Sequence, residues 1–362
     1  MLDNFSSILI LLKYPLIGLF SLFSILSFYW PTIFKFFNLK PYNNVQRVHK
    51  NEVSRLSGLI IYFFFWIIYL FGFVQDNFFF SLLFSALPFV LISIKEDLFH
   101  NTTPKNRLFL MIISCLIFFY INPITFPIID IPYIGKIIAL YPVSIIFFTF
   151  SILVVMNGMN LIDGMNGLFA LTAFFQLITL AILSYLYEDY ESLRISLLFV
   201  LPLVIFLFFN FPFGKLFIGD LGAYLYGFLV SLVAINLFGK NIYLLTWLAI
   251  LIFFYPCMEL LFSFIRKTLN KQSPFDPDDK HLHTLLNKIL FAKLNNQNLA
   301  NCLTTVSLFI FWLTPIIFCA FIVINFYFVI GIVAFQSILY YSCYTFLSHK
   351  VKHDKRNSNH YS

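Results

Sequence analysis

Charged residues are scarce in this 362-residue chain: Asp, Glu, Lys and Arg make up 11% of it, whereas 60% is hydrophobic. Soluble globular domains carry about 25% charged residues, so the composition excludes that class. Cysteine is also scarce, and the five cysteines lie in apolar runs without CxxC spacing, which gives no sign of a disulfide framework or a zinc site. No linker or composition shift divides the chain, and we expect one membrane domain over residues 1–362.

Long apolar runs are what the chain has in abundance. A run of about 20 residues crosses the roughly 30 Å hydrocarbon core of a bilayer, and eleven such runs can be read from the sequence. They lie near 8–29, 58–74, 77–94, 107–122, 137–156, 166–186, 194–211, 222–238, 242–265, 302–323 and 325–347. The pattern predicts an all-α polytopic membrane protein with about 11 transmembrane helices.

The net charge of +7 is distributed unevenly. If the eleven helices alternate, 19 of the 23 Lys and Arg residues fall on one side of the bilayer, and only Lys136, Arg194 and Lys240 fall on the other. Loops rich in Lys and Arg stay in the cytoplasm, so we expect the N-terminus outside and the C-terminus inside. The bilayer accounts for the basic charge without a nucleic-acid partner.

Two cytoplasmic segments are predicted near the C-terminus. Residues 266–301 form the longest connection, and residues 349–362 form a basic cytoplasmic tail. An apolar stripe at helical spacing in the connection predicts a short amphipathic helix on the membrane surface. The stripe consists of Leu282, Leu285, Leu286, Ile289 and Leu290.

The polar residues gather in five stretches on the predicted cytoplasmic side. They are QRVHKNEVSRLSG (46–58), KEDL (95–98), NGMNLIDGMNG (157–167), FGKLFIGDLGAY (213–224) and SPFDPDDKHLHTLL (273–286). Carboxylates at mid-membrane would mark an ion or substrate pathway, but these lie at the membrane edge. Dense carboxylate oxygens suit Mg²⁺ or Mn²⁺, and Arg, Lys and His suit phosphate. The pattern indicates phosphoryl chemistry between a soluble nucleotide and a reactant held in the membrane.

Each stretch also has a purely structural interpretation. An acidic pair at a helix end, such as Glu96 and Asp97, is usually solvated. Asp163 would fit a simple glycine turn, and Asp220 would fit a helix cap. Glu259, in the run before residue 266, is either a further wall of the cleft or a solvated residue near a helix end. The joint arrival of these stretches at one membrane face favours a site.

In this order, the five stretches resemble those of the polyprenyl-phosphate N-acetylhexosamine-1-phosphate transferases. This family includes phospho-N-acetylmuramoyl-pentapeptide transferase and the undecaprenyl-phosphate GlcNAc-1-phosphate transferases, and the resemblance covers most of the chain. It implies transfer of a sugar-1-phosphate from a UDP-N-acetylhexosamine to polyprenyl phosphate, with Mg²⁺ as cofactor and release of UMP. It also implies a place in the bacterial inner membrane, with the active site facing the cytoplasm.

The resemblance implies a role for several acids. Asp220 corresponds to the metal ligand, and Asp97 lies close to the metal and the phosphates. Asn160 and Asp163 match the NxxDGxxG loop that holds the nucleotide and the catalytic centre. Glu96 stands where the family usually has Asp, which moves the carboxylate by about one methylene and argues against a covalent nucleophile. Direct attack by the lipid phosphate is therefore expected, with Asp97, and Glu96 beside it, positioning or deprotonating the acceptor.

The same resemblance assigns the basic residues. His281 and His283 match an HxH motif that contacts pyrophosphate or sugar, and the basic loop that approaches a phosphate contributes Arg47, His49 and Lys50. Two residues spaced like these histidines point to different sides of a regular helix. Both can face one ligand only from an extended or first-turn position.

The sequence leaves open which donor the enzyme uses, and two other classes of protein are alternatives to the enzyme. The donor is a simple or modified UDP-N-acetylhexosamine for O-antigen or capsule initiation, or else the muramoyl pentapeptide of peptidoglycan synthesis. A transporter or lipid flippase would have acids at mid-membrane and helices broken by Gly or Pro in paired halves. An inactive scaffold would not need to retain Asp97, Asp163, Asp220 and both histidines. The sequence leaves a homodimer open, because uniformly apolar runs single out no dimerising face.

Overall fold

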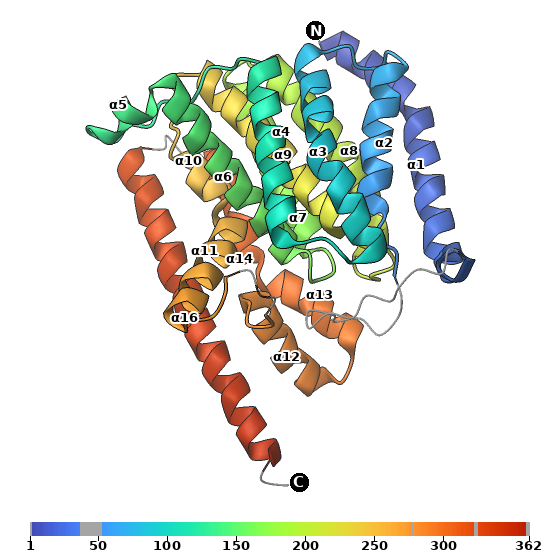
Figure 1. Ribbon diagram of the computed structural model, residues 1–362, viewed down its shortest axis with the longest axis vertical. Helices are drawn as coiled ribbons and strands as arrows, with labels where there is room; N and C mark the ends of the chain where they lie inside the picture. The colour runs from blue at the N-terminus through green and yellow to red at the C-terminus, as the bar shows by residue number, and fades with distance from the viewer. Residues whose placement is uncertain (1, 37–52, 275, 277, 322–324, 360–362) are drawn as a thin grey trace.

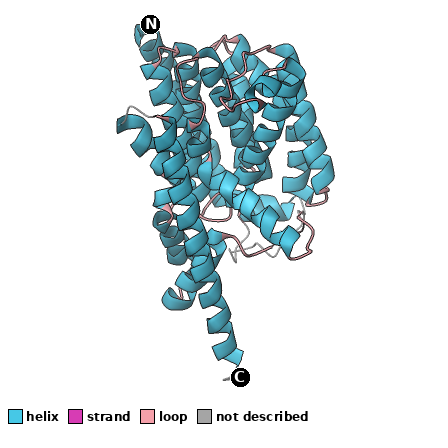
Figure 2. Cartoon of the chain, turned by 90° about the vertical axis from the view of Figure 1, so that its left-hand side faces the viewer, coloured by secondary structure: helices cyan, strands magenta, loops and turns pink. Residues whose placement is uncertain are grey.

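A computed structural model describes residues 2–36, 53–274, 276, 278–321 and 325–359. Over these ranges the named elements are all helices (Figure 2), and an isolated parallel bridge joins Ser54 to Leu216. The predicted all-α class is confirmed. The helices are α1 (Leu2–Phe36), α2 (Ser57–Leu70), α3 (Asn77–Phe99), α4 (Pro104–Ile121), α5 (Ile134–Ile138), α6 (Tyr141–Ile162), α7 (Leu168–Leu186), α8 (Tyr190–Asn210), α9 (Gly219–Lys240), α10 (Leu248–Ile252), α11 (Phe254–Leu269), α12 (Leu282–Leu294), α13 (Gln297–Ser307), α14 (Phe309–Trp312), α15 (Thr314–Phe321) and α16 (Phe326–Asn359).

Eight helices within the described part of the chain are long and apolar enough to cross a membrane. They are α1, α3, α4, α6, α7, α8, α9 and α16. Helix α2 is apolar but has 14 residues. The run at 242–265 divides into α10 and α11, and the run at 302–323 divides among α13, α14 and α15. Pro256 and Pro315 lie near the starts of α11 and α15, where a missing N–H removes no helical hydrogen bond. The polytopic membrane class is confirmed, and the count of about eleven stays a prediction.

Helix α9 is the central helix of the bundle. Its apolar window is 100% buried, against 17% for the windows of α1 and α16, which leave most of their surface to lipid. Glycines let its neighbours approach closely. A Cβ on Gly58 in α2 would lie 2.3 Å from the backbone nitrogen of Gly222, and one on Gly227 would lie 2.7 Å from the Cα of Met156 in α6. The backbone N–H of Gly58 also donates to the carbonyl of Ile218 at 2.9 Å.

Gly58→Ala is expected to lower the free energy of unfolding by roughly 1–3 kcal/mol, because the added methyl group overpacks the contact between α2 and α9. Thermal unfolding in detergent micelles measures the loss. Gly331→Ala is the matched control, since a Cβ on Gly331 in α16 meets nothing within 4 Å. Equal melting temperatures for the two variants would contradict this close packing.

The predicted cytoplasmic segments lie at one end of the bundle. Figure 1 shows α12 and α13 at this end and α16 extending past it. Helix α12 falls within the stretch predicted to hold a short helix, and it buries Leu282, Leu285 and Ile289 of the predicted stripe. The residues of the basic tail up to 359 continue α16.

Candidate active site

Asp97 connects the last turn of α3 to the first turn of α9. Its two carboxylate oxygens accept hydrogen bonds from the backbone N–H groups of Asp220, at 2.8 Å, and Leu221, at 3.0 Å. The first N–H groups of a helix have no partner within it, and a carboxylate there satisfies them. Gly219 enters the helix with φ +76°, a left-handed conformation that favours glycine. The two predicted metal-binding acids, 123 residues apart in the chain, are therefore adjacent.

Two guanidinium groups neutralise Asp220. Arg55, just before α2, places Nη2 2.8 Å from Oδ1 of Asp220, and Arg107, in the first turn of α4, pairs with Oδ2. Arg55 also brings Nε within 3.6 Å of Oδ1 of Asp97. The family resemblance implied no individual role for either arginine. Arg55 stands inside the first polar stretch, and the signal for Arg107 is a cation that follows the acidic pair in the same predicted loop.

Asp163 is a half-buried carboxylate at the end of α6. Among the described residues neither Asp163 nor Asn160, one turn earlier, has a side-chain hydrogen bond or an ion pair. Burial raises the pKa of the Asp163 carboxyl well above its usual range; Arg55 opposes this shift, and Asp220 and Asp97 add to it. These opposing influences are consistent with a place for Asp163 on the side of the cluster formed by Arg55, Asp97 and Asp220. The Asp163 carboxylate is therefore available for a ligand at this cluster.

The glycine-rich loop that carries Asp163 is braced by the segment after α8. Oδ1 of Asn210 accepts a hydrogen bond from the N–H of Gly167 at 2.6 Å, and Nδ2 donates to the carbonyl of Leu216 at 2.7 Å. Gly167 has φ +78°, and a Cβ there would lie 2.6 Å from the ring of Phe211. These contacts require glycine at position 167 and fix the loop against the start of α9.

His281 and His283 face the same carboxylate. Nδ1 of His281 lies 3.2 Å from Oε2 of Glu259, and Nδ1 of His283 lies 3.5 Å from Oε1. His281 precedes α12 with an extended backbone, and His283 is the second residue of α12, so the spacing argument is confirmed. A Cβ on Gly164 would lie 3.5 Å from Nε2 of His283, so the pair borders the loop of Asp163. Glu259 is 1% exposed, and the alternative of a solvated residue is wrong.

Glu96 points to the loop between α3 and α4. Its Oε2 accepts hydrogen bonds from the N–H and hydroxyl of Thr102 at 2.9 and 2.6 Å. The carboxylate of Glu96 thus stabilises this loop, whereas that of Asp97 reaches α9. Three of the predicted phosphate contacts lie outside the described residues, namely Arg47, His49 and Lys50.

Asp97 and Asp220 offer the donors that a hard cation needs. In the described part of the chain no group of three or more His, Cys, Asp and Glu residues is arranged to hold a metal ion. Mg²⁺, however, usually keeps several waters and takes one or two protein carboxylates together with substrate phosphates. The two carboxylates fit this pattern, and the arginine pairs on Asp220 would share the oxygens with the cation.

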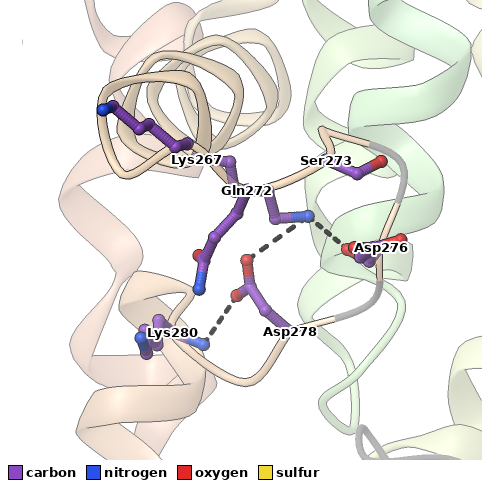
Figure 3. Close-up of a pocket in the computed structure, with 7 residues that line it drawn as sticks. Lys267, Gln272, Ser273, Asp276, Asp278 and Lys280 are labelled. Atoms are coloured by element: carbon purple, nitrogen blue, oxygen red, sulfur yellow. Dashed lines mark hydrogen bonds and ion pairs between the residues drawn. The ribbon is translucent and has the colours of Figure 1, made fainter.

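A pocket of about 390 Å³ adjoins the histidine pair between α11 and α12 (Figure 3). Asp278 in its wall pairs with Arg266 at 2.8 Å and Lys267 at 3.3 Å. Burial opposes the shift, but hydrogen bonds from the Lys280 N–H and Arg266 lower the pKa of Asp278 to about 2. Its Oδ1 lies 3.8 Å from Nε2 of His281. The lining residues are Lys267, Lys271, Gln272, Ser273, Asp276, Asp278 and Lys280.

Part of the chain is similar to known proteins. Residues 79–238 match glycosyl transferase family 4. This range contains Asp97, Asp163 and Asp220, and the histidine pair lies beyond it. The undecaprenyl-phosphate alpha-N-acetylglucosaminyl 1-phosphate transferase of Thermotoga maritima is 27% identical over 67% of this chain and 71% of the relative.

Two further relatives carry related names. A probable undecaprenyl-phosphate N-acetylglucosaminyl 1-phosphate transferase of Bacillus subtilis is 32% identical over 40% of this chain and 39% of the relative. The phospho-N-acetylmuramoyl-pentapeptide-transferase of Dictyoglomus thermophilum is 34% identical over 51% of this chain and 63% of the relative. The chain thus spans less than two thirds of these two proteins. Together with the polytopic membrane fold, these matches confirm the resemblance that the motifs indicated, and residues 79–238 are similar to glycosyl transferase family 4.

Proposed function

We propose that the protein transfers an N-acetylhexosamine-1-phosphate from a UDP-sugar to undecaprenyl phosphate and releases UMP. The observation that carries this proposal is a cluster of three acids and two arginines. It lies where α3 and α6 end and where α4 and α9 begin. The residues are Asp97, Asp163, Asp220, Arg55 and Arg107. A diphosphate and a lipid phosphate can meet only at such a membrane edge. The asymmetry of Lys and Arg supports a cytoplasmic site in a bacterial inner membrane.

These residues would have two roles, to balance the charge of the phosphates and to keep Asp220 in place. Asp97 and Asp220 would hold Mg²⁺, or Mn²⁺ in its place, and the bound ion would neutralise phosphate oxygens and the departing UMP. Arg55 and Arg107 supply further positive charge for the diphosphate. Because Asp97 caps α9, it also keeps Asp220 in place.

The transfer itself needs no covalent enzyme intermediate. An oxygen of the lipid phosphate forms a bond to the β-phosphorus of the donor, and the bond from that phosphorus to the bridging oxygen breaks, so that this oxygen leaves with UMP. Asp163 and Asn160 orient the nucleotide, since both side chains lack partners among the described residues. We assign Glu96 no part in the bond changes, because two hydrogen bonds from Thr102 hold its Oε2 at the loop between α3 and α4.

UDP-GlcNAc and related UDP-N-acetylhexosamines are the favoured donors, for initiation of an O-antigen or capsule-type polysaccharide. The names of the Thermotoga and Bacillus relatives support this choice. The muramoyl-pentapeptide donor of peptidoglycan synthesis is the second candidate, because the Dictyoglomus relative carries that name.

An assay of UMP release tests the proposal. The purified protein in lipid nanodiscs would receive undecaprenyl phosphate, Mg²⁺ and one UDP-sugar at a time, including the muramoyl-pentapeptide donor. We expect UMP and lipid-linked sugar phosphate in equal amounts, loss of both with EDTA, and recovery with Mg²⁺ or Mn²⁺. A transporter, flippase or scaffold would release no UMP from any donor, and that result would overturn the proposal.

A further inference from the structure

We propose that Glu259 is a positioning residue that fixes the orientation and the tautomer of His281 and His283 as one unit. The contribution of this unit to substrate binding rests on the proposed function, whereas the geometry of the unit does not. His283 would then present its Nε2 to the loop that carries Asp163, near Gly164, whereas Nε2 of His281 would face Asp278. An unprotonated Nε2 accepts a hydrogen bond, so this arrangement suits contact with a sugar hydroxyl of a nucleotide sugar, and contact with a phosphate oxygen would require the imidazolium form.

Burial shows why Glu259 needs both histidines. The residue lies in the second turn of α11 and is 1% exposed, and a carboxylate taken out of water must find hydrogen-bond donors. Nδ1 of His281 is 3.2 Å from Oε2, and Nδ1 of His283 is 3.5 Å from Oε1. The hydroxyl of Tyr255, one turn earlier, donates to Oε1 at 3.3 Å. Each carboxylate oxygen therefore faces the Nδ1 atom of a different imidazole.

The two rings behave geometrically as a pair. Their planes are 4° from parallel, and their centroids are 5.5 Å apart. A carboxylate accepts hydrogen bonds and donates none when ionised, so the hydrogen bond between His281 and Glu259 requires the proton of that neutral imidazole on Nδ1. Nδ1 of His283 makes no hydrogen bond within the described residues, but it faces Oε1 at 3.5 Å, where the charge of the carboxylate favours a proton on the same atom. Which ring nitrogen carries the proton is set by the hydrogen bond that the other makes. Nε2 of both rings is then left as the atom that faces away from Glu259.

A second anchor on α11 restrains the same segment. Arg266 lies two turns after Glu259 and binds Asp278 at 2.8 Å, and Oδ1 of Asp278 lies 3.8 Å from Nε2 of His281. Within the described residues this buried Nε2 has no hydrogen-bond partner. Helix α11 thus holds the histidine segment at two points, through Glu259 and through the pair of Arg266 with Asp278.

The primary test reads the tautomers directly and needs no activity. Full-length protein with ¹⁵N-labelled histidine in nanodiscs would be studied by NMR at about pH 8.5, where ordinary imidazoles are neutral. His281→Asn and His283→Asn spectra assign the two signals. We expect the Nδ1–H form for both residues in the unaltered protein. An Nε2–H form at either position would overturn the inference, even if no variant of Glu259 folds.

Substitutions at Glu259 provide the matched comparison. Glu259→Gln offers an amide donor in place of one carboxylate oxygen, so at least one histidine should change to the Nε2–H form. Glu259→Asp keeps the carboxylate and should retain the Nδ1–H forms in part. Tyr255→Phe removes one donor to the same carboxylate and should leave both tautomers unchanged. A purely structural role for Glu259 would destabilise the Gln variant without altering the tautomers, and that result would contradict positioning.

A kinetic measurement connects the unit to the reaction. If the protein releases UMP as proposed, Glu259→Gln should raise KM for the UDP-sugar about 10-fold, by analogy with the 10- to 100-fold effects of residues that orient ligating histidines. The change in kcat should be smaller, and Glu259→Asp should recover much of the affinity. No UMP from the unaltered protein would reject the proposed function and leave the NMR result standing. Unchanged KM in an active Gln variant would reject the role of the pair in binding.

Discussion

Asp163→Asn is expected to lower the rate of UMP release by at least about 100-fold without lowering the melting temperature. The carboxylate of Asp163 has no ion pair or hydrogen bond among the described residues, and burial raises its pKa well above the usual range. Its charge therefore contributes nothing favourable to folding that the amide would lose. Function should depend on the carboxyl group, because an amide cannot lose a proton and take on the negative charge that a cation bound beside Asp97 and Asp220 would favour.

UMP release and thermal unfolding of the same nanodisc preparation check this prediction. Asp130→Asn is the matched control, because Asp130 is exposed in the loop before α5. It should retain both activity and melting temperature. Full activity of Asp163→Asn would remove Asp163 from the site, and a large fall in melting temperature would show that its carboxylate supports the fold instead.

Gly219→Ala is expected to reduce UMP release by on the order of 100-fold, since a misplacement of about 1 Å can cost that much. The φ of +76° at Gly219 disfavours any residue with a Cβ. A Cβ there would also lie 2.2 Å from the carbonyl oxygen of Arg55 and 2.8 Å from Oδ2 of Asp97. Relief of this clash must move Arg55, Asp97 or the start of α9, which carries Asp220.

Activity and unfolding temperature should fall together in this variant, in contrast to Asp163→Asn. Gly18→Ala is the control, because a Cβ on Gly18 in α1 meets nothing within 4 Å. It should match the unaltered protein in both measurements. An active and fully stable Gly219→Ala protein would be incompatible with the close approach of Asp97 to the first turn of α9.

The sequence predicted those features that depend on local pattern. Apolar runs predicted the membrane class, helical spacing predicted α12, and the His281–His283 spacing required the extended and first-turn positions that the structure has. The expected closeness of Asp97 and Asp220 is also confirmed. Asp97 lies in the last turn of α3, Asp220 lies in the first turn of α9, and the two helix ends meet.

Features that depend on the direction of single side chains could not be predicted. Glu96 and Asp97 are neighbours in the chain, yet the first binds Thr102 and the second caps α9, because adjacent helical residues point about 100° apart. The pairing of Arg107 with Asp220 depends on how α4 packs beside α3 and α9. The position of Glu259 between two imidazoles follows from the packing of α11, which a uniformly apolar run does not reveal.

Helix α9 is enclosed by protein over its whole apolar length, while α1 and α16 present most of their surface to the surroundings. Deformation imposed by a thicker, thinner or more curved bilayer therefore acts first on these outer helices. Asp220 lies on α9, the helix that is enclosed by the others and is therefore the last to feel a deformation of the bilayer. A layer of protein therefore separates the proposed site on α9 from the bilayer in which its proposed lipid substrate would dissolve.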